Sequence, residues 1–230
     1  MKLMLALAPI LLLSPGCASP PESKPLAARD NELTDQEKQD GWILLFDGKS
    51  PEGWTNLKQT NVEDGCINPY KSGNYVTCTK DRYADFVIAC DFKLTKDCNS
   101  GVFIRTADPK DPVQTGIEIQ IYDTRSEKPN KHDCGAIYDL VAPSKNTLKP
   151  LGEWNHIEIT CDKNRISVVM NGEAISSMDL DLWTDAGKNP DGSANKFKKA
   201  LKDFSREGFL GLQDHGKPCW FKNVKLKKLG

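Results

Sequence analysis

The sequence lacks the short motifs that mark several large enzyme classes. It contains no G-x-S-x-G nucleophile elbow, no P-loop, no G-x-G-x-x-G turn and no H-E-x-x-H zinc motif. Its eight cysteines include no C-x-x-C pair, which removes support for a zinc ribbon or a thioredoxin-like redox site. Serine hydrolases of the elbow type, nucleotide-dependent enzymes and zincin-type proteases are therefore disfavoured.

The sequence also lacks a charge excess and a long hydrophobic run. Its 230 residues include 31 Lys and Arg against 32 Asp and Glu, so the formal net charge is −1 and no nucleic-acid partner is expected. The apolar run 3–13 is far shorter than the ~20 residues that a membrane-spanning helix needs. A hydrophobic content of 38% with 27% charged residues is typical of a globular protein, and we expect one folded domain.

The N-terminus has the features of an export signal. A lysine and the apolar run are followed by small residues and then by Cys17. This pattern resembles a bacterial lipoprotein signal, in which Cys17 is lipidated, and an ordinary secretory signal is the alternative. We expect a lipid anchor in the bacterial cell envelope, with the protein facing the periplasm or the outside. The expected organisation is a signal peptide at 1–16, a lipidated tether at 17–32 and a domain at 33–230.

Alternating apolar residues predict short strands through most of the chain. The alternation is clear around Glu118 and Gln120, which face away from three isoleucines on the same strand. Turn residues at 162–164 and 171–172 predict two hairpins, and a short capped helix is expected at 33–40. Many short strands separated by turns are typical of an all-β protein, and we predict a sandwich of two antiparallel sheets with a short N-terminal helix.

Two places in the sequence can carry chemistry. Alternation puts Phe103 and Arg105 on one side of their strand, so Arg105 and Glu118 line one surface if the two strands are neighbours. Such a surface suits a sugar or another polar ligand, and the plain alternative is a solvated outer face. His215 lies between an aspartate and a glycine, where it suits a general base or a ligand, or belongs to an ordinary polar turn.

A metal site stays open at this point. Carboxylate and imidazole groups that can bind a metal occur at Glu118, Asp123, Asp139 and His215. Their spacing specifies no metal, so the sequence establishes no cofactor and leaves a divalent cation open.

The disulfide pairing of the seven cysteines after Cys17 cannot be read from the sequence. An exported domain meets oxidising conditions, and an odd number leaves at least one cysteine unpaired within the chain. Cys90 and Cys161 fall on the core faces of two predicted strands, where buried thiols are expected.

Seven segments of the chain resemble, in the expected order, the 3-keto-disaccharide hydrolase domain family. Together they extend over about residues 40–229. The resemblance implies a concanavalin A-like jelly-roll sandwich and the cleavage of glycosides already oxidised at C3 of the sugar. The segments are 41–49 with Gly53-Trp54, 99–105, 116–123, 134–139, 152–155, 211–216 and 220–223.

The implied reaction differs from ordinary glycoside hydrolysis. A C3 ketone acidifies the C2 proton, so a base can remove it, the aglycone leaves from C1 and water then adds, without paired carboxylates. The resemblance assigns His215 or Glu118 as the base and Arg105, or a divalent cation in its place, as the group that stabilises the enolate. The positions assigned to substrate binding are Asn99, Gln120, Asp123, Tyr138 and Gln213.

The alternative function is a non-catalytic, lectin-like carbohydrate-binding module, because jelly-roll folds host both enzymes and lectins. A lectin mainly needs aromatic platforms. The enzyme needs Arg105, Glu118 and His215 to converge in one cleft.

Overall fold

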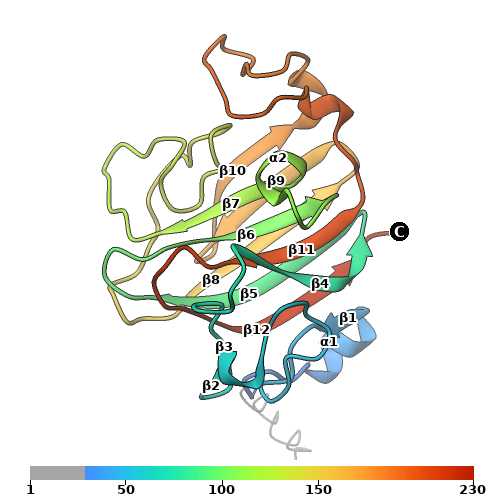
Figure 1. Cartoon of the computed structure of the whole chain (residues 1–230), viewed down its shortest axis with the longest axis vertical. Helices are drawn as coiled ribbons and strands as arrows, with labels where there is room; N and C mark the ends of the chain where they lie inside the picture. Colours follow the sequence, from blue (N-terminus) through green and yellow to red (C-terminus); the bar gives the residue numbers. More distant parts are fainter. Residues whose placement is uncertain (1–28) are drawn as a thin grey trace, which may run out of the picture.

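The computed structural model describes residues 29–230, which form two stacked β-sheets (Figure 1). The expected signal peptide, most of the expected tether and Cys17 lie outside the described residues. One sheet has eight strands in the order β10-β9-β8-β5-β12-β3-β2, with β1 paired to β12, and the other has four in the order β4-β11-β6-β7. All these strand pairs are antiparallel, which confirms the predicted all-β sandwich.

The strands are short and the helices shorter still. The eight-stranded sheet contains β1 (Trp42–Leu44), β2 (Val62–Glu63), β3 (Cys66–Ile67), β5 (Phe86–Leu94), β8 (Asn155–Asp162), β9 (Arg165–Met170), β10 (Glu173–Asp179) and β12 (Cys219–Lys228). The four-stranded sheet contains β4 (Val76–Tyr83), β6 (Asn99–Thr106), β7 (Ile117–Tyr122) and β11 (Gly208–Gln213). The helices are α1 (Asp35–Gln39), α2 (Pro112–Thr115) and the 3-10 turns η1 (Gln59–Asn61), η2 (Leu180–Leu182) and η3 (Leu201–Asp203). None of the helices in the described part is long and apolar enough to cross a membrane.

The local signals in the sequence correspond to the observed elements. Thr34 and Glu37 form a reciprocal capping box at the start of α1, as the predicted helix requires. Asn171 and Gly172 adopt φ angles of +52° and +82° between β9 and β10, the left-handed pair that a tight hairpin turn needs. The second predicted hairpin joins β8 to β9.

The hydrophobic core lies between the two sheets. The isoleucines of β7 contribute to it, as do alternating residues of β5. Glu118 and Gln120 point to the opposite face of β7, yet they are only 5% and 2% exposed. That face is therefore covered by other parts of the chain, and the solvated outer face considered as an alternative does not apply here.

The seven described cysteines are all buried and all unpaired. Cys90 and Cys161 lie in the core, as expected. Burial raises the pKa of the Cys78 thiol to about 11 and those of Cys134 and Cys161 to about 12. These three thiols behave as small apolar side chains.

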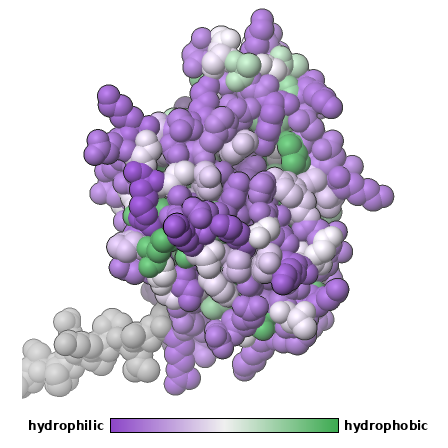
Figure 2. All heavy atoms as spheres, turned by 60° about the vertical axis from the view of Figure 1, so that its left-hand side comes forward, coloured by the Kyte–Doolittle hydropathy of each residue, from purple (hydrophilic) through white to green (hydrophobic). Residues whose placement is uncertain are grey.

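The surface is largely polar. Figure 2 shows small, separate hydrophobic patches among hydrophilic side chains on the face that it presents. This distribution is what a sandwich produces when its apolar residues are collected between the sheets.

Candidate active site

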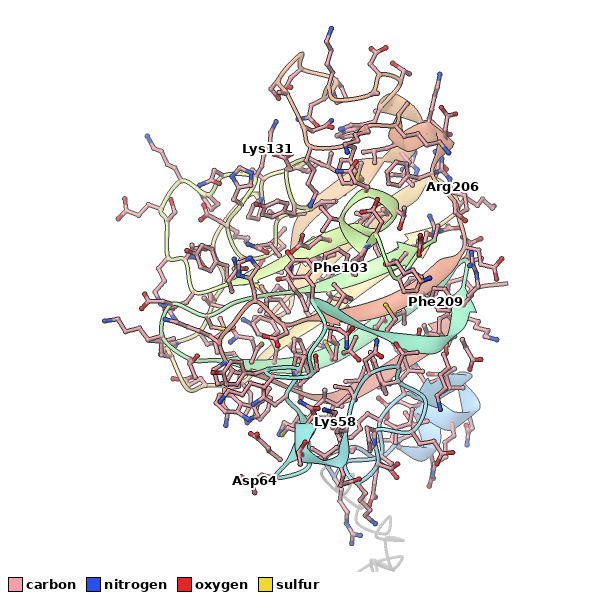
Figure 3. All side chains as sticks on the ribbon, viewed as in Figure 1. Lys58, Asp64, Phe103, Lys131, Arg206 and Phe209 are labelled. Atoms are coloured by element: carbon pink, nitrogen blue, oxygen red, sulfur yellow. The ribbon has the colours of Figure 1, made fainter. Side chains whose placement is uncertain are left out.

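A cavity of about 180 Å³ lies over the face of the four-stranded sheet that points away from the core. It lies beside Phe103 of β6, which is labelled in Figure 3 and is paired in register with Glu118. Six of the eight residues predicted for catalysis or substrate binding line this cavity. The lining residues are Tyr75, Asn99, Val113, Glu118, Gln120, Tyr138, Lys196, Gln213 and His215.

Glu118 is a buried carboxylate held on both of its oxygens. Gln213 Nε2 donates a hydrogen bond to Oε1 at 2.9 Å, and Lys196 Nζ lies 3.3 Å from Oε2. The Gln120 amide, in the orientation that satisfies both of its ends, donates to Oε1 at 3.2 Å. Burial nevertheless outweighs these contacts and raises the pKa of Glu118 above 4.5, because a charged carboxylate loses its water there.

Gly101 of β6 provides the space for the Glu118 side chain. A Cβ at this position would lie 2.9 Å from Glu118 Oε1 and 3.0 Å from its Cγ. The glycine of the Asn99–Arg105 segment is therefore explained by the carboxylate packed directly over its backbone, because a larger residue would displace that side chain.

Lys196 reaches the cavity from the long connecting segment between β10 and β11, residues 180–207. Its backbone N–H donates to Asp139 Oδ2 at 2.6 Å, and its Nζ lies 4.3 Å from the centre of the Tyr138 ring. Tyr138 in turn donates its backbone N–H to the carbonyl of Glu118. Asp139 and Tyr138 thus fix the lysine against the carboxylate. No motif around Lys196 marked it in the sequence, because its role depends on a segment about 80 residues away in the chain.

Tyr75 and His215 form the mouth of the cavity. The Tyr75 hydroxyl accepts a hydrogen bond from Gln213 Nε2 at 2.7 Å, and its ring lies 5.8 Å from that of His215. Burial, reinforced by the negative charge of Glu118, raises the pKa of Tyr75 to about 12. The phenol is therefore protonated at neutral pH and can donate a proton. Sequence reasoning missed Tyr75, which precedes β4 in a turn-rich stretch.

The prediction that Arg105 shares a surface with Glu118 is wrong. The strands are neighbours as expected, but Arg105 has a φ angle of +50°, which breaks the alternation at the end of β6. Its guanidinium is 1% exposed and joins the turn between β4 and β5 to the turn between β8 and β9. Its hydrogen-bond acceptors are Asp85 Oδ1 at 2.8 Å and the carbonyls of Ala84 and Lys163.

Asp123 also lies outside the cavity. Its carboxylate accepts the backbone N–H of Asp97 at 3.1 Å and pairs with Arg125 at 3.5 Å, so it stabilises the loop before β6. The four carboxylate and imidazole groups considered as metal ligands are not all brought together, because Glu118 and His215 line the cavity and Asp123 and Asp139 do not. Within residues 29–230, no group of three or more His, Cys, Asp or Glu side chains is placed to hold a metal ion.

Comparison with known proteins identifies the family of the chain. The sequence profile of the 3-keto-alpha-glucoside-1,2-lyase-like domain family matches residues 41–227, which include every residue that lines the cavity. The chain belongs to this family. It is also 29% identical to a 3-keto-disaccharide hydrolase of Bacteroides thetaiotaomicron, over 83% of this chain and 79% of that protein.

Solved structures from Parabacteroides distasonis, each described as a candidate glycosyl hydrolase, share the fold of this family member. One is 35% identical, with a TM-score of 0.70 over 82% of this chain and 99% of the other. A second is 30% identical, with a TM-score of 0.71 over 88% of this chain and the whole of the other. The two-sheet architecture is therefore common to the chain and to these relatives.

The cavity offers three kinds of chemistry to a bound ligand. Glu118 can accept a proton, Lys196 can stabilise negative charge on an oxygen, and Tyr75 can donate a proton. Asn99 and Gln120 present amides that can hydrogen-bond to hydroxyl groups.

Proposed function

We propose that this protein, an enzyme of the glycoside-cleaving kind, cleaves 3-keto-glycosides by elimination followed by hydration. The observation that carries the proposal is the buried carboxylate of Glu118 beside the ammonium of Lys196 in one small cavity. The family description and the name of the Bacteroides relative both support a 3-keto sugar as the substrate class.

Glu118 is the base in this proposal. Its raised pKa makes the ionised carboxylate a stronger proton acceptor than an ordinary one, and the C2 proton of a 3-keto sugar is acidic enough to be transferred. His215 was the other candidate. It lies exposed at the mouth of the cavity, whereas Glu118 lies buried at its floor, which favours Glu118.

Lys196 takes the role that the resemblance gave to Arg105. When the C2–H bond breaks, its electron pair forms the C2=C3 bond of an enolate, and the charge falls on the C3 oxygen. An ammonium held beside a buried carboxylate can stabilise that charge, because burial lowers the dielectric screening by solvent. Lys196 Nζ is the cation held beside Glu118, so it is placed for this task.

The remaining steps balance with one water molecule. The enolate reforms the C3 ketone as a C1=C2 double bond forms and the C1–O bond breaks, and the aglycone oxygen takes a proton from a donor such as Tyr75. Water then adds its hydroxyl to C1 and gives its other proton back to Tyr75, while the proton held by Glu118 returns to C2. The products are a 3-keto sugar and the free aglycone.

The lectin-like alternative is not favoured. A binding module has no use for a carboxylate that burial has made more basic, since a neutral amide would bind a hydroxyl group at a lower cost in desolvation.

The test is aglycone release from a 3-keto-glycoside and from its unoxidised parent. We expect release from the oxidised substrate alone, and Glu118→Gln should lower kcat by at least about 10²-fold, the usual contribution of a general base. Exchange of the C2 proton of 3-keto-glucose for deuterium in D2O reports the base separately, and Glu118→Gln should abolish that exchange. Glu173→Gln, an exposed carboxyl paired with Lys145, is the matched control.

Lys196→Met tests the role of Lys196 in stabilising the enolate. The positive charge of Lys196 lowers the pKa of Glu118, so its removal should shift the acid limb of the kcat profile to higher pH as well as lower kcat. Lys145→Met is the control for loss of a surface lysine. An unshifted profile would contradict the pairing of Lys196 with the base, and no release from any 3-keto-glycoside by the wild type would contradict the function itself.

The expected cell-envelope location remains a proposal. The pattern around Cys17 supports lipidation at that residue, which would tether the described domain to a membrane by lipid alone.

A further inference from the structure

A second and larger cavity lies next to the candidate active site. Its volume is about 720 Å³, against about 180 Å³ for the first. Tyr75 lines both cavities. The start of α2 contacts both cavities, since Pro112 lines the larger one and Val113 the smaller one. The two cavities therefore adjoin at Tyr75 and at the start of α2.

The two cavities differ in chemistry. The smaller one is lined by carboxylate, amide, ammonium and imidazole groups. The floor of the larger one contains the buried Val76 and Pro112 and the half-buried ring of Phe209. The exposed residues at its rim are Pro109 and the polar Asn56, Asn74, Lys80 and Lys110. Two further polar residues are already engaged, because the hydroxyls of Thr55 and Thr79 form hydrogen bonds to the backbone.

Phe209 provides a flat apolar surface in this floor. It is half-buried and packs against the cluster of Val76, Cys78 and Phe103, which is separate from the main core. The guanidinium of Arg82 lies over the Phe209 ring, 5.1 Å from its centre. Figure 3 labels Phe103 and Phe209 over neighbouring strands of the four-stranded sheet.

We propose that the larger cavity is the binding site for the aglycone and that it selects apolar, ring-shaped aglycones over a second sugar. This inference rests on the proposed function, because the oxidised sugar has to occupy the smaller cavity. A second hexose carries several hydroxyl groups that would need partners, and the floor offers few free ones. An aromatic aglycone instead buries its ring against Phe209 and Val76.

The test compares the phenyl and methyl 3-keto-glucosides of one anomeric configuration with a 3-keto-disaccharide. The wild type should favour the phenyl over the methyl compound by at least about tenfold in kcat/KM, as expected for burial of one aromatic ring. It should also favour the phenyl compound over the disaccharide. Equal values for phenyl and methyl, or a preference for the disaccharide, would overturn the inference.

Variants of Phe209 test whether this residue causes the preference for the phenyl over the methyl glucoside. Phe209→Ala should lower the phenyl-to-methyl ratio about tenfold, and Phe209→Tyr, which keeps the ring, should retain it. Should Phe209→Ala melt below the assay temperature, Phe209→Leu keeps apolar volume without the flat ring and should give an intermediate ratio. Leu182→Ala, at a residue 62% exposed and outside both cavities, is the control for loss of an apolar side chain. A ratio in Phe209→Ala equal to that of the wild type would overturn the assignment.

Binding separates this inference from the proposed function. If the wild type cleaves none of the 3-keto-glucosides, the proposed function fails, and calorimetry with the unoxidised phenyl and methyl glucosides still tests the cavity. Binding of the phenyl glucoside at least about tenfold more tightly than the methyl glucoside, lost in Phe209→Ala, would support it. Equal affinities would overturn it.

Discussion

Glu118 is a residue at which chemistry and stability have opposite requirements. Its carboxylate is 5% exposed, and burial raises its pKa, so the native state binds a proton more readily than the unfolded chain does. Between pH 4.5 and the pKa in the folded protein, the free energy of unfolding therefore falls as the pH rises. Above that window the ionised carboxylate lowers stability by a constant amount, which a neutral side chain at this position would not do.

Glu118→Gln should accordingly melt at a higher temperature than the wild type at pH 7, and by a larger margin there than at pH 4. The glutamine keeps the shape of the side chain and removes the buried charge, whose effect on stability appears only when the carboxyl is ionised. Thermal denaturation at the two pH values measures this, with Glu173→Gln as an exposed control. A melting difference that is the same at both pH values would show that Glu118 does not titrate abnormally.

Gly101→Ala should remove activity while leaving the fold intact. The new methyl group would meet the flexible end of the Glu118 side chain, so the carboxylate has to move and the β6–β7 pairing can stay. A displacement of about 1 Å in a catalytic group is enough to cost on the order of 10²-fold in rate. Steady-state kinetics and circular dichroism together check this. Wild-type kcat in a folded Gly101→Ala protein would mean that the position of Glu118 is not critical.

At the scale of elements, the connecting segment between β10 and β11 decides where Lys196 lies. Asn189 is the buried centre of this segment. Its Nδ2 donates to the carbonyl of Asp139 at 3.2 Å, and its Oδ1 accepts from Trp183 Nε1 at 2.8 Å. The segment is thereby joined to the residue that also binds the backbone N–H of Lys196.

Asn189→Ala should therefore lower both stability and kcat. Loss of hydrogen bonds to buried groups typically costs about 1–3 kcal/mol in the free energy of unfolding. The kcat should fall at least about tenfold, because Lys196 loses part of its support. Denaturant unfolding and aglycone release measure the two effects, and Asp185→Ala, an exposed residue of the same segment, is the control. Wild-type kcat in a less stable Asn189→Ala protein would show that this segment does not position the lysine.

Elements also explain which site residues could be anticipated from the sequence. Glu118 and Gln120 lie in the middle of a regular strand, so alternation predicted their shared face correctly. Arg105 lies at the end of β6, where one residue with a positive φ angle turned its side chain elsewhere. Alternation holds only while the backbone is regular, and no sequence signal marked the point at which it stops.

At the scale of the whole molecule, the described domain contains the core and the cavity, whereas the N-terminal segment contains the signals for the proposed location. The domain is stabilised by a core between two sheets with its seven cysteines unpaired, and the cavity residues come from both the β-strands and the connecting segments. The proposed location of the protein in the cell envelope depends instead on Cys17 and the residues before it.

Cys17→Ala should move the protein from the membrane fraction to the soluble fraction of an expressing bacterium. Without its thiol the chain cannot accept the lipid that the proposed anchor requires. Cell fractionation with detergent extraction measures this, and Ser23→Ala in the expected tether is the control. Retention of Cys17→Ala in the membrane fraction would contradict lipid anchoring.

The sequence by itself determined the strands from β5 onward with their inward faces, the capped helix and two hairpin turns, because each of these depends on neighbours a few residues apart. It did not mark β1, β2, β3 or β4. Its motifs also indicated the family and six residues of the cavity. Only the tertiary structure decided that Lys196 and Tyr75 join Glu118, that Arg105 does not, and that a larger apolar cavity adjoins the site. Those outcomes depend on strand order and on contacts between segments up to 140 residues apart, which local patterns in the chain do not encode.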